Sequence, residues 1–443
     1  MKIYIKTYGC QMNERDSEAL AGMLAARGHE IISGEEGADA MIFNTCSVRD
    51  QAERKAVGKL GFMKKNKNAN PALILGVIGC MAQRRGEELL QELPHLDFVL
   101  GTGKLHTLPD LLESIAAERR RCSETDESDE VLTGMGAHYL SENQWGAQIA
   151  ITRGCNRFCA YCIVPYVRGR EISRAMDDVV SEARTLAEKG IREIMLLGQN
   201  VAAYGLNGNT NPPPEGISPF ADLLQEIARI DGIERIRFTS PYPTYFNDKL
   251  IDTIAATPKV CRNIHLPLQS GSNRILKMMN RQYTAEIYWE IVQKLRAKMP
   301  ELTFSTDVIV GFPGETEEDF IMTRDLMNRV GFDNAFIFKY SPRPGTRSAA
   351  GEDSVPQEVK EERNQILLAD LAERTQNNLA KLVGTTVEVL AEGPSKRMPE
   401  RWSGRTSTFR TVHFLPPENI RPGDLIQIRI LRAGTVSLYG EVC

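Results

Sequence analysis

The sequence predicts an α/β protein with three structured parts: an N-terminal open parallel α/β sheet, a central partial (β/α) barrel and a small C-terminal β-barrel. Three observations predict this fold class. Strand and helix patterns alternate through the first 115 residues, alternate again over about 147–375, and give way to short strands separated by Gly and Pro turns after residue 381. Such alternation is typical of parallel sheets covered by helices.

The N-terminal part contains four strand candidates, over residues 2–7, 38–44, 73–78 and 98–100. Helical patterns connect them over residues 16–27, 49–63 and 83–91, and Gly28 stands where the first helix is expected to stop. A charged stretch at 118–130 has few apolar residues and predicts a linker that contains Cys122.

The central part contains six strand candidates with helical patterns between most of them, which predicts a barrel or partial barrel. These strands are 148–152, 193–197, 235–239, 263–266, 304–310 and 334–338, and a surface loop is expected at 205–216. We therefore expect an N-terminal domain over 1–117, a linker over 118–140 and a central domain over 141–378.

An amphipathic helix over 359–382 precedes the C-terminal domain, expected at 379–443. Its four strand candidates are 386–390, 408–414, 425–430 and 436–442.

Composition narrows the functional classes. The net charge of −4 disfavours a non-specific nucleic-acid binder, although a local basic patch would suffice for a specific one. No apolar run is long enough for a membrane span, and the N-terminus lacks the apolar segment of a signal peptide, so we expect a cytoplasmic protein. In that compartment the nine cysteines are expected to be metal ligands, nucleophiles or buried residues rather than disulfides.

Cys155, Cys159 and Cys162, called here the loop triad, form a Cys-x3-Cys-x2-Cys pattern directly after a strand candidate. Three thiolates at this spacing suit three irons of a four-iron cluster and leave the fourth iron open to chelate a small molecule. Zinc is the competing ligand, but a structural zinc site normally takes four protein ligands.

Cys10, Cys46 and Cys80, called here the N-terminal triad, are far apart in the sequence, but each closely follows a strand candidate. Ligands bind outside the carboxyl ends of the strands in an open parallel sheet, so the three cysteines are expected to meet at one edge. Together they predict a second iron–sulfur cluster with an open iron, whereas each one alone would be a small buried residue.

These two triads resemble those of a known family. The loop triad is the motif of the radical S-adenosylmethionine (SAM) superfamily, and the stretches 7–18, 44–49 and 79–83 around the N-terminal triad resemble the methylthiotransferases. Tyr-Gly-Cys-Gln-Met-Asn at 8–13 resembles the MiaB branch, which acts on tRNA. The ribosomal-protein branch typically shows Leu-Gly-Cys-Pro-Lys-Asn there, and the threonylcarbamoyladenosine branch Leu-Gly-Cys-Lys-Val-Asn.

The resemblance runs nearly from end to end, because the stretches 163–171, 196–200, 265–272, 307–315 and 340–346 also match the family. It implies that SAM is bound near Gly198, Gln199, Asn200, Gln269, Gly311 and Gly314. One departure concerns Tyr242, because the family usually has a histidine in a Ser-His-Pro-like stretch there.

Other polar residues have weaker assignments. His265 is expected to be a satisfied strand residue, and no general base is assigned. Arg168, Arg170 and Arg174 are expected either to meet phosphates or carboxylates or to lie on a solvated face, and Cys261 and Cys443 are expected to be incidental.

The resemblance implies two [4Fe–4S] clusters and SAM as cofactors, with one cluster on each triad. One SAM would methylate a sulfide at the N-terminal triad, and a second would supply the radical that abstracts a hydrogen atom from C2 of N6-isopentenyladenosine beside the anticodon. The implied partners are the tRNA anticodon stem-loop, an electron donor such as flavodoxin or ferredoxin, and a sulfur or cluster source. A monomer with no membrane partner is expected.

The C-terminal part is locally basic, with nine Lys and Arg residues against six Asp and Glu residues over 381–443, a net charge of +3. The stretches 393–397 and 404–406 resemble a TRAM domain, a small RNA-binding β-barrel. Trp402 and Phe409 are candidates for base stacking, and the alternative is a solvated basic face.

Three other functions remain open at this point. The same chemistry would serve threonylcarbamoyladenosine in tRNA or an aspartate of a ribosomal protein. A non-catalytic iron–sulfur protein that binds RNA, or a zinc-binding scaffold, would carry the cysteines without cleaving SAM.

Overall fold

The structure is a computed structural model that describes residues 1–47, 50–128, 132–206, 208–209 and 211–443. The chain divides into two compact units. The first contains Met1–Ser141, Thr152–Phe158 and Cys162–Arg174, and the second contains Glu142–Ile151, Cys159–Tyr161 and Ala175–Cys443.

The first unit is built on a six-stranded parallel sheet in the order β2-β1-β3-β4-β5-β6. Its strands are β1 (Lys2–Tyr8), β2 (Glu30–Ile32), β3 (Ala40–Thr45), β4 (Ile74–Gly79), β5 (Phe98–Leu100) and β6 (Cys122–Glu124). Every residue of β3 and β4 is buried, as expected for central strands covered on both faces. The predicted open parallel sheet is confirmed.

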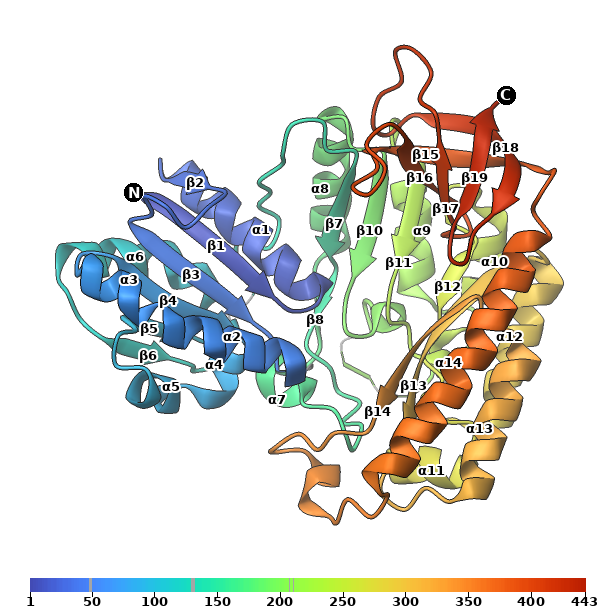
Figure 1. The fold of residues 1–443 in the computed structure, drawn as a ribbon, viewed down its shortest axis with the longest axis horizontal. Coiled ribbons are helices and arrows are strands. Elements are labelled where there is room, and N and C mark those ends of the chain that lie inside the picture. The colour runs from blue at the N-terminus through green and yellow to red at the C-terminus, as the bar shows by residue number, and fades with distance from the viewer. Residues whose placement is uncertain (48–49, 129–131, 207, 210) are drawn as a thin grey trace. The chain divides into compact units, whose positions relative to one another are not determined.

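Helices cover both faces of this sheet (Figure 1). Ile42 of β3 and Ile78 of β4 pack in one cluster with Leu20 of α1 (Gln11–Ala26) and Leu112 of α6 (Leu108–Ala117). The other face, which includes Phe43, packs against α2 (Asp50–Phe62), α4 (Cys80–Arg85) and α5 (Glu87–Glu92). Because Ile42 and Phe43 are neighbours in a strand, their side chains point to opposite faces.

Two strands of this sheet were not predicted. β2 and β6 are only three residues long, which is too short for an alternating pattern to show. β6 lies inside the predicted linker, and its Cys122 packs against the hydrophobic cluster under α1 and α6. The charged stretch therefore contains an edge strand. Residues 129–131 of the predicted linker lie outside the described residues.

The second unit carries six parallel strands in two sheets, β11-β10-β7 and β12-β13-β14, which confirms the predicted partial (β/α) barrel. The strands are β7 (Gly146–Ala150), β10 (Glu193–Leu197), β11 (Arg235–Phe238), β12 (Asn263–His265), β13 (Thr303–Val310) and β14 (Asn334–Lys339). The intervening helices are α8 (Met176–Glu188), α9 (Pro219–Ala228), α10 (Asp248–Ala256), α11 (Asn273–Met278), α12 (Ala285–Lys298) and α13 (Glu317–Val330), and α14 (Gln357–Ala380) follows β14.

The start of α13 shows why these helices begin where they do. Thr316 accepts a hydrogen bond from the Asp319 backbone, and Asp319 accepts one from the Thr316 backbone, so the two form a capping box. Side chains of Ser218, Asn247 and Thr284 cap α9, α10 and α12 in a similar way.

The C-terminal strands form a closed barrel in the order β15-β16-β17-β19-β18. They are β15 (Thr386–Pro394), β16 (Trp402–Thr406), β17 (Thr411–Phe414), β18 (Leu425–Ala433) and β19 (Leu438–Val442). The predicted small β-barrel is confirmed, although β16 was missed because it is short and largely polar. Its Gly404 is required for packing, since an added Cβ would lie 2.3 Å from the Leu390 carbonyl oxygen.

This barrel caps the amino-terminal ends of the parallel strands of the second unit. Arg262, just before β12, donates its backbone N–H to Ser407 Oγ at 2.9 Å. Thr303, at the start of β13, donates to the Thr408 carbonyl at 3.0 Å. Arg410 pairs with Asp333, just before β14, at 2.9 Å. The carboxyl ends of the strands, where ligands bind in parallel α/β folds, therefore lie away from the barrel.

The described part of the chain contains no helix with the length and apolar character that a membrane span requires.

Candidate cluster and cofactor sites

The N-terminal triad lies at the carboxyl ends of three neighbouring strands. Tyr8 of β1 pairs with Thr45 of β3, and Thr45 pairs with Gly79 of β4. Cys46 and Cys80 come one residue after their paired positions, and Cys10 comes two residues after its own. The register therefore brings together three residues that are far apart in the sequence.

The side chains of this triad interact directly. Cys46 and Cys80 are buried, and Cys10 is partly buried at the N-terminus of α1. The pKa of the Cys10 thiol is lowered to about 5, chiefly because its thiolate accepts a hydrogen bond from Cys46, and the charge of Arg168 adds to the effect. Burial raises the pKa of Cys80, while Arg168 opposes that rise. The triad thus has one readily ionised thiol and a cation beside it.

A polar network holds the backbone around the triad. Asn13 donates to Asn44 Oδ1 at 2.8 Å, and Asn44 donates back to the Asn13 carbonyl at 2.9 Å, which ties α1 to β3. Gly79 has a φ of +94°, and a Cβ there would lie 2.4 Å from Asn44 Oδ1. Only glycine permits this close approach beside Cys80.

Arg168 of α7 (Val164–Arg168) is the charged partner of the triad. It is buried, pairs with buried Asp16 at 2.9 Å, and retains an Nη1 group that is buried without a hydrogen-bond partner within the described residues. A bound anionic group beside Cys10 and Cys80 would satisfy that donor. Three thiols with a buried cation therefore fit an iron–sulfur cluster, whose ligands are thiolates.

The three arginines after the loop triad have different surroundings. Arg168 meets the Asp16 carboxylate, and Arg170 packs over the Phe158 ring at 4.6 Å. Arg174 is 9% exposed. Of the two alternatives, the solvated face is therefore wrong for Arg168 and Arg174, and Arg168 meets a carboxylate.

Local contacts hold the loop triad. The Cys155 N–H donates to the Gly169 carbonyl at 3.1 Å in the first unit. In the second unit, the Ala160 N–H donates to the Met279 carbonyl at 2.9 Å, and the Ala160 carbonyl accepts from the Ser348 N–H at 2.8 Å. All three cysteines are partly exposed, so a ligand can reach them.

Arg281 is a functional candidate that sequence reasoning missed. Its guanidinium donates to Cys159 Sγ at 3.3 Å and lies over the rings of Tyr242 and Tyr283, at 4.3 and 4.9 Å from their centroids. Tyr242 is buried, and its hydroxyl accepts the Gln282 N–H at 2.7 Å. The tyrosine that departs from the family pattern thus supports a cation at the loop triad. The adjacent aromatic residues were the only sequence signal for this arrangement.

Residues 198–200 follow β10 directly, as predicted. Asn200 Oδ1 accepts the Tyr242 backbone N–H at 2.9 Å. The buried Gln199 Oε1 and Asn200 Nδ2 have no hydrogen-bond partner within the described residues. Two buried polar atoms without partners at a strand end fit a site for a polar ligand such as SAM.

Gln269 lies beyond β12 in a constrained conformation. Its φ is +68°, its backbone N–H donates to the Asp307 carbonyl at 2.8 Å, and its carbonyl accepts the Ile309 N–H at 3.0 Å. A left-handed conformation is uncommon for glutamine and is held here by β13.

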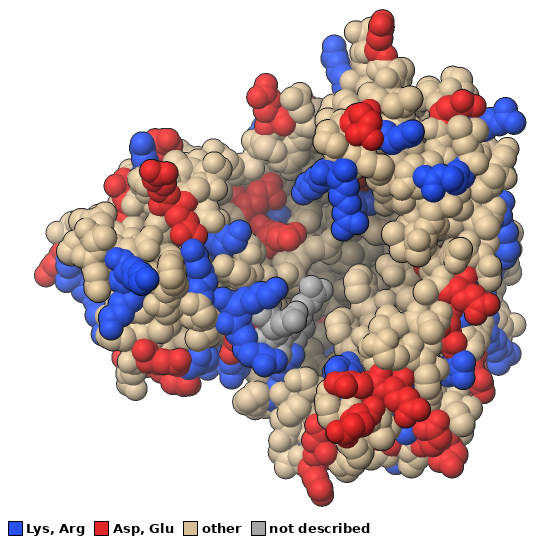
Figure 2. All heavy atoms as spheres, in the orientation of Figure 1, with Lys and Arg blue, Asp and Glu red and all other residues tan. Residues whose placement is uncertain are grey.

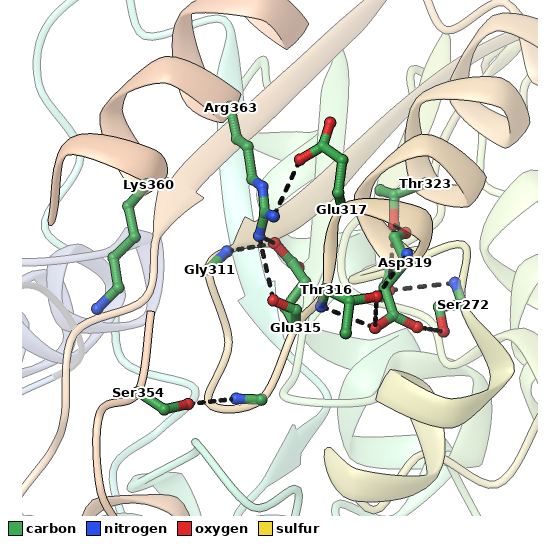
Figure 3. Close-up of polar contacts among 12 residues, drawn as sticks. Ser272, Gly311, Glu315, Thr316, Glu317, Asp319, Thr323, Ser354, Lys360 and Arg363 are labelled. Atoms are coloured by element: carbon green, nitrogen blue, oxygen red, sulfur yellow. Dashed lines mark hydrogen bonds and ion pairs between the residues drawn. The ribbon is translucent and has the colours of Figure 1, made fainter. Parts of the chain in front are cut away.

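The glycine turn after β13 is held by a buried network (Figure 3). Glu315 Oε1 accepts the Gly311 N–H at 2.8 Å and also accepts from Arg363 of α14 at 2.8 Å. The Gly314 N–H donates to Ser354 Oγ at 2.8 Å. Burial raises the pKa of Glu315, while the Gly311 N–H and Arg363 oppose that rise. The sequence predicted the turn but not its support, because Glu315 and Arg363 are distant in the chain.

Gly311 itself requires glycine, since its φ is +69° and an added Cβ would lie 2.3 Å from Lys360 Cγ. Glycine at this position therefore lets the turn pack closely against Lys360 of α14.

Within the described residues, no three His, Cys, Asp or Glu side chains are close enough to hold one metal ion. The ligands of a four-iron cluster bind separate irons and so stand farther apart than those of one ion.

Comparisons with known proteins match this chain over its whole length. Residues 2–101 match the model described as "Uncharacterized protein family UPF0004", and residues 149–327 match that of the radical SAM superfamily. A protein of Opitutus terrae named tRNA-2-methylthio-N(6)-dimethylallyladenosine synthase is 46% identical over 100% of this chain and 97% of its own length. A protein of the same name from Akkermansia muciniphila is 45% identical over 100% of this chain and 99% of its own length.

Solved structures share the fold. The radical SAM methyltransferase TsrM from Kitasatospora setae superposes with a TM-score of 0.60 at 15% identity, covering 79% of this chain and 75% of TsrM. The cobalamin-dependent radical SAM enzyme OxsB superposes with a TM-score of 0.53 at 11% identity, covering 85% of this chain and 56% of OxsB. At these identities the likeness concerns the fold alone.

Proposed function

This chain belongs to the family of the tRNA-2-methylthio-N(6)-dimethylallyladenosine synthases, and we propose that its two cysteine triads each hold one [4Fe–4S] cluster of that reaction. SAM and [4Fe–4S] clusters are the cofactors, and the substrate is tRNA. The reaction replaces the C2 hydrogen of N6-isopentenyladenosine, next to the anticodon, with a methylthio group. When bound, the clusters and SAM supply an electron, a hydrogen-abstracting radical and a methylated sulfur.

The single observation that carries the proposal is the meeting of Cys10, Cys46 and Cys80 at one sheet edge. A radical SAM enzyme needs only the loop triad to cleave SAM, so a second cysteine site serves another step. In the N-terminal triad, Arg168 would balance the negative charge of the thiolates, and the Asn13–Asn44 pair would hold their spacing.

At the loop triad, Arg281 would donate a hydrogen bond to the Cys159 thiolate and so favour the reduced, more negative cluster. We propose that Gly198, Gln199, Asn200 and Gln269 bind SAM, with the Gly311–Gly314 turn beside its adenine. The buried polar atoms of Gln199 and Asn200, which lack partners within the described residues, support their assignment to SAM. The Glu315–Arg363 contact, which holds the glycine turn in place, supports the assignment of the turn to the adenine.

The C-terminal barrel is proposed to bind the RNA stem-loop. Figure 2 shows Lys and Arg side chains on this barrel among Asp and Glu side chains. Phe409 is 41% exposed and its ring contacts the guanidinium groups of Arg237 and Arg405, whereas Trp402 packs against the barrel core. Phe409 is therefore the better stacking candidate of the two.

The remaining assignments are also proposals: a cytoplasmic monomer, a flavodoxin- or ferredoxin-type electron donor, a separate sulfur or cluster source, and domain limits at 1–117, 141–378 and 379–443.

The test is an anaerobic assay. Protein reconstituted with iron and sulfide receives reductant, SAM and tRNA that contains isopentenyladenosine. Mass spectrometry of the digested tRNA then measures the 2-methylthio nucleoside, and 5′-deoxyadenosine is counted in parallel. Both products are expected.

Three negative outcomes are distinct. Formation of 5′-deoxyadenosine with unmodified tRNA would leave threonylcarbamoyladenosine or a ribosomal-protein aspartate as the substrate. Binding of tRNA without any SAM cleavage would indicate a non-catalytic iron–sulfur protein, and zinc in metal analysis would indicate a scaffold.

A further inference from the structure

One face of the β12-β13-β14 sheet carries partly exposed side chains and is called here the open face. Phe304 of β13 lies on the covered face, where Arg296 of α12 packs over its ring at 5.3 Å. Asp307 and Ile309 point the other way, because alternate residues of a strand face opposite sides. Their partners in β14 are Phe336 and Phe338, which therefore share this second face.

Two aromatic side chains on that face are exposed. Phe336 is 48% exposed and Phe338 is 42% exposed. Their rings lie nearly parallel, at an interplanar angle of 14° with centroids 6.5 Å apart. The two rings are neighbours on the same face and together expose apolar surface. Adjacent exposed aromatic side chains are candidates for a binding surface.

A polar pair borders the rings. His265 lies beside Phe336, with ring centroids 6.0 Å apart, and is held between Ser305 Oγ at 3.0 Å and Asp307 Oδ2 at 3.2 Å. The Asp307 side chain remains 29% exposed. The open face therefore combines two aromatic rings with one accessible carboxylate.

The same face continues to the loop triad. Ile309, the register partner of Phe338, packs against the cluster that contains Ala160 and Phe312. Ala160 stands next to Cys159, and Phe312 belongs to the glycine turn after β13. A group bound on Phe338 therefore lies beside Ile309, which packs against the cluster that contains the neighbour of Cys159.

We propose that Phe336, Phe338 and Asp307 form the specificity surface for the target base. This inference rests on the proposed function and deepens it. The two rings receive the purine and its apolar N6 substituent by stacking, as aromatic side chains do for unpaired RNA bases. Asp307 repels a base whose substituent carries a carboxylate, as threonylcarbamoyladenosine does, so the surface selects by attraction and by repulsion.

The test measures RNA binding by the reconstituted holoenzyme in the presence of SAM. Three anticodon stem-loops differ only at the target position, which holds isopentenyladenosine, threonylcarbamoyladenosine or an abasic site. Fluorescence anisotropy gives the three dissociation constants. The wild-type protein is expected to bind the isopentenyladenosine RNA about tenfold more tightly than the abasic RNA, as one base stack contributes.

The variant F336A/F338A is expected to lose that preference and to keep its affinity for the abasic RNA. D307N is expected to bind the threonylcarbamoyladenosine RNA more tightly than the wild type does, so that its dissociation constant comes closer to that of the isopentenyladenosine RNA. I321A/M322A is the matched control, because both residues are exposed and apolar on α13, and it should leave every ratio unchanged.

Retention of the full base preference by F336A/F338A would overturn the proposal. If that variant loses its clusters, F336L/F338L preserves the apolar packing and removes only the aromatic rings, and the same loss of preference is expected. Failure of the wild-type protein to methylthiolate tRNA would instead defeat the proposed function. A wild-type protein that methylthiolates while F336A/F338A retains its preference defeats this inference alone.

Discussion

The two cysteine triads are both proposed to bind a [4Fe–4S] cluster, but the fold brings their cysteines together in different ways. The loop triad spans eight residues, so its three cysteines are already close together along the chain and depend little on the rest of the fold. The N-terminal triad spans 71 residues and exists only because β1, β3 and β4 are neighbours in matched register. The first site is local and the second is a product of topology. We therefore expect substitutions in the sheet to damage the N-terminal site while sparing the loop.

The largest effect is expected from removing one cysteine of each triad. C10A should abolish methylthiolation and retain SAM cleavage, with iron falling from about eight to about four atoms per chain because one four-iron cluster is lost. C159A should abolish both activities. C261A is the matched control, since Cys261 is buried and lies outside both triads. Loss of SAM cleavage in C10A would contradict the separation of the two sites.

The next effect concerns the buried ion pair beside the N-terminal triad. R168M leaves the Asp16 carboxylate buried without its partner, so the free energy of unfolding of the first unit should fall by about 3–5 kcal/mol. Urea denaturation of the apoprotein measures it. D16N/R168M should recover part of the loss, because no charge is then stranded. Equal stabilities of R168M and the wild type would show that the pair contributes nothing.

A smaller effect depends on pH. Burial raises the pKa of Glu171 to about 7 from its ordinary value of 4.5. The protonated carboxyl therefore stabilises the fold below pH 4.5, and this stabilisation is lost as pH rises through 7. At pH 8, E171Q should be more stable than the wild type by up to about 3 kcal/mol, and the difference should vanish near pH 4.5. Urea midpoints over this pH range measure the difference, and a constant difference would refute the assignment.

The smallest effect is expected near the loop triad. Y242F removes the hydroxyl that accepts the Gln282 N–H but keeps the ring under Arg281, so stability should fall by about 1 kcal/mol. Thermal unfolding measures the loss. Cluster content and SAM cleavage should persist. Loss of the loop cluster in Y242F would mean that the hydroxyl, rather than the ring, holds Arg281.

Most of the fold was predictable because long apolar strands give a clear hydrophobic pattern in the sequence. β10 was predicted with its observed limits, and the helix α14 to within two residues at each end. β2, β6 and β16 were missed because they are short or polar, and pairing with a neighbour defines them rather than their own pattern. The same reasoning explains why Cys122 was assigned to a linker.

The six cysteines were predictable as candidates because their spacing and their strand-end positions are visible in the sequence. The residues that support them were not. Arg281 reaches Cys159 across 122 positions, and Arg363 reaches Glu315 across 48. Such contacts depend on how the elements pack, which the spacing of the residues along the sequence does not specify. Val48 and Arg49 of the motif around Cys46 lie outside the described residues.

The C-terminal barrel lies at the amino-terminal ends of the strands, so the strand length sets the distance between the barrel and the carboxyl ends. β13 has eight residues, so its two ends are separated by about 23 Å at the rise of a β-strand. An RNA that touches both the barrel at the amino-terminal ends of the strands and Cys159 beyond their carboxyl ends must span about that length. A trinucleotide is too short to do so, whereas a folded hairpin is long enough. The length of the second unit therefore selects RNA by size, independently of which base is recognised.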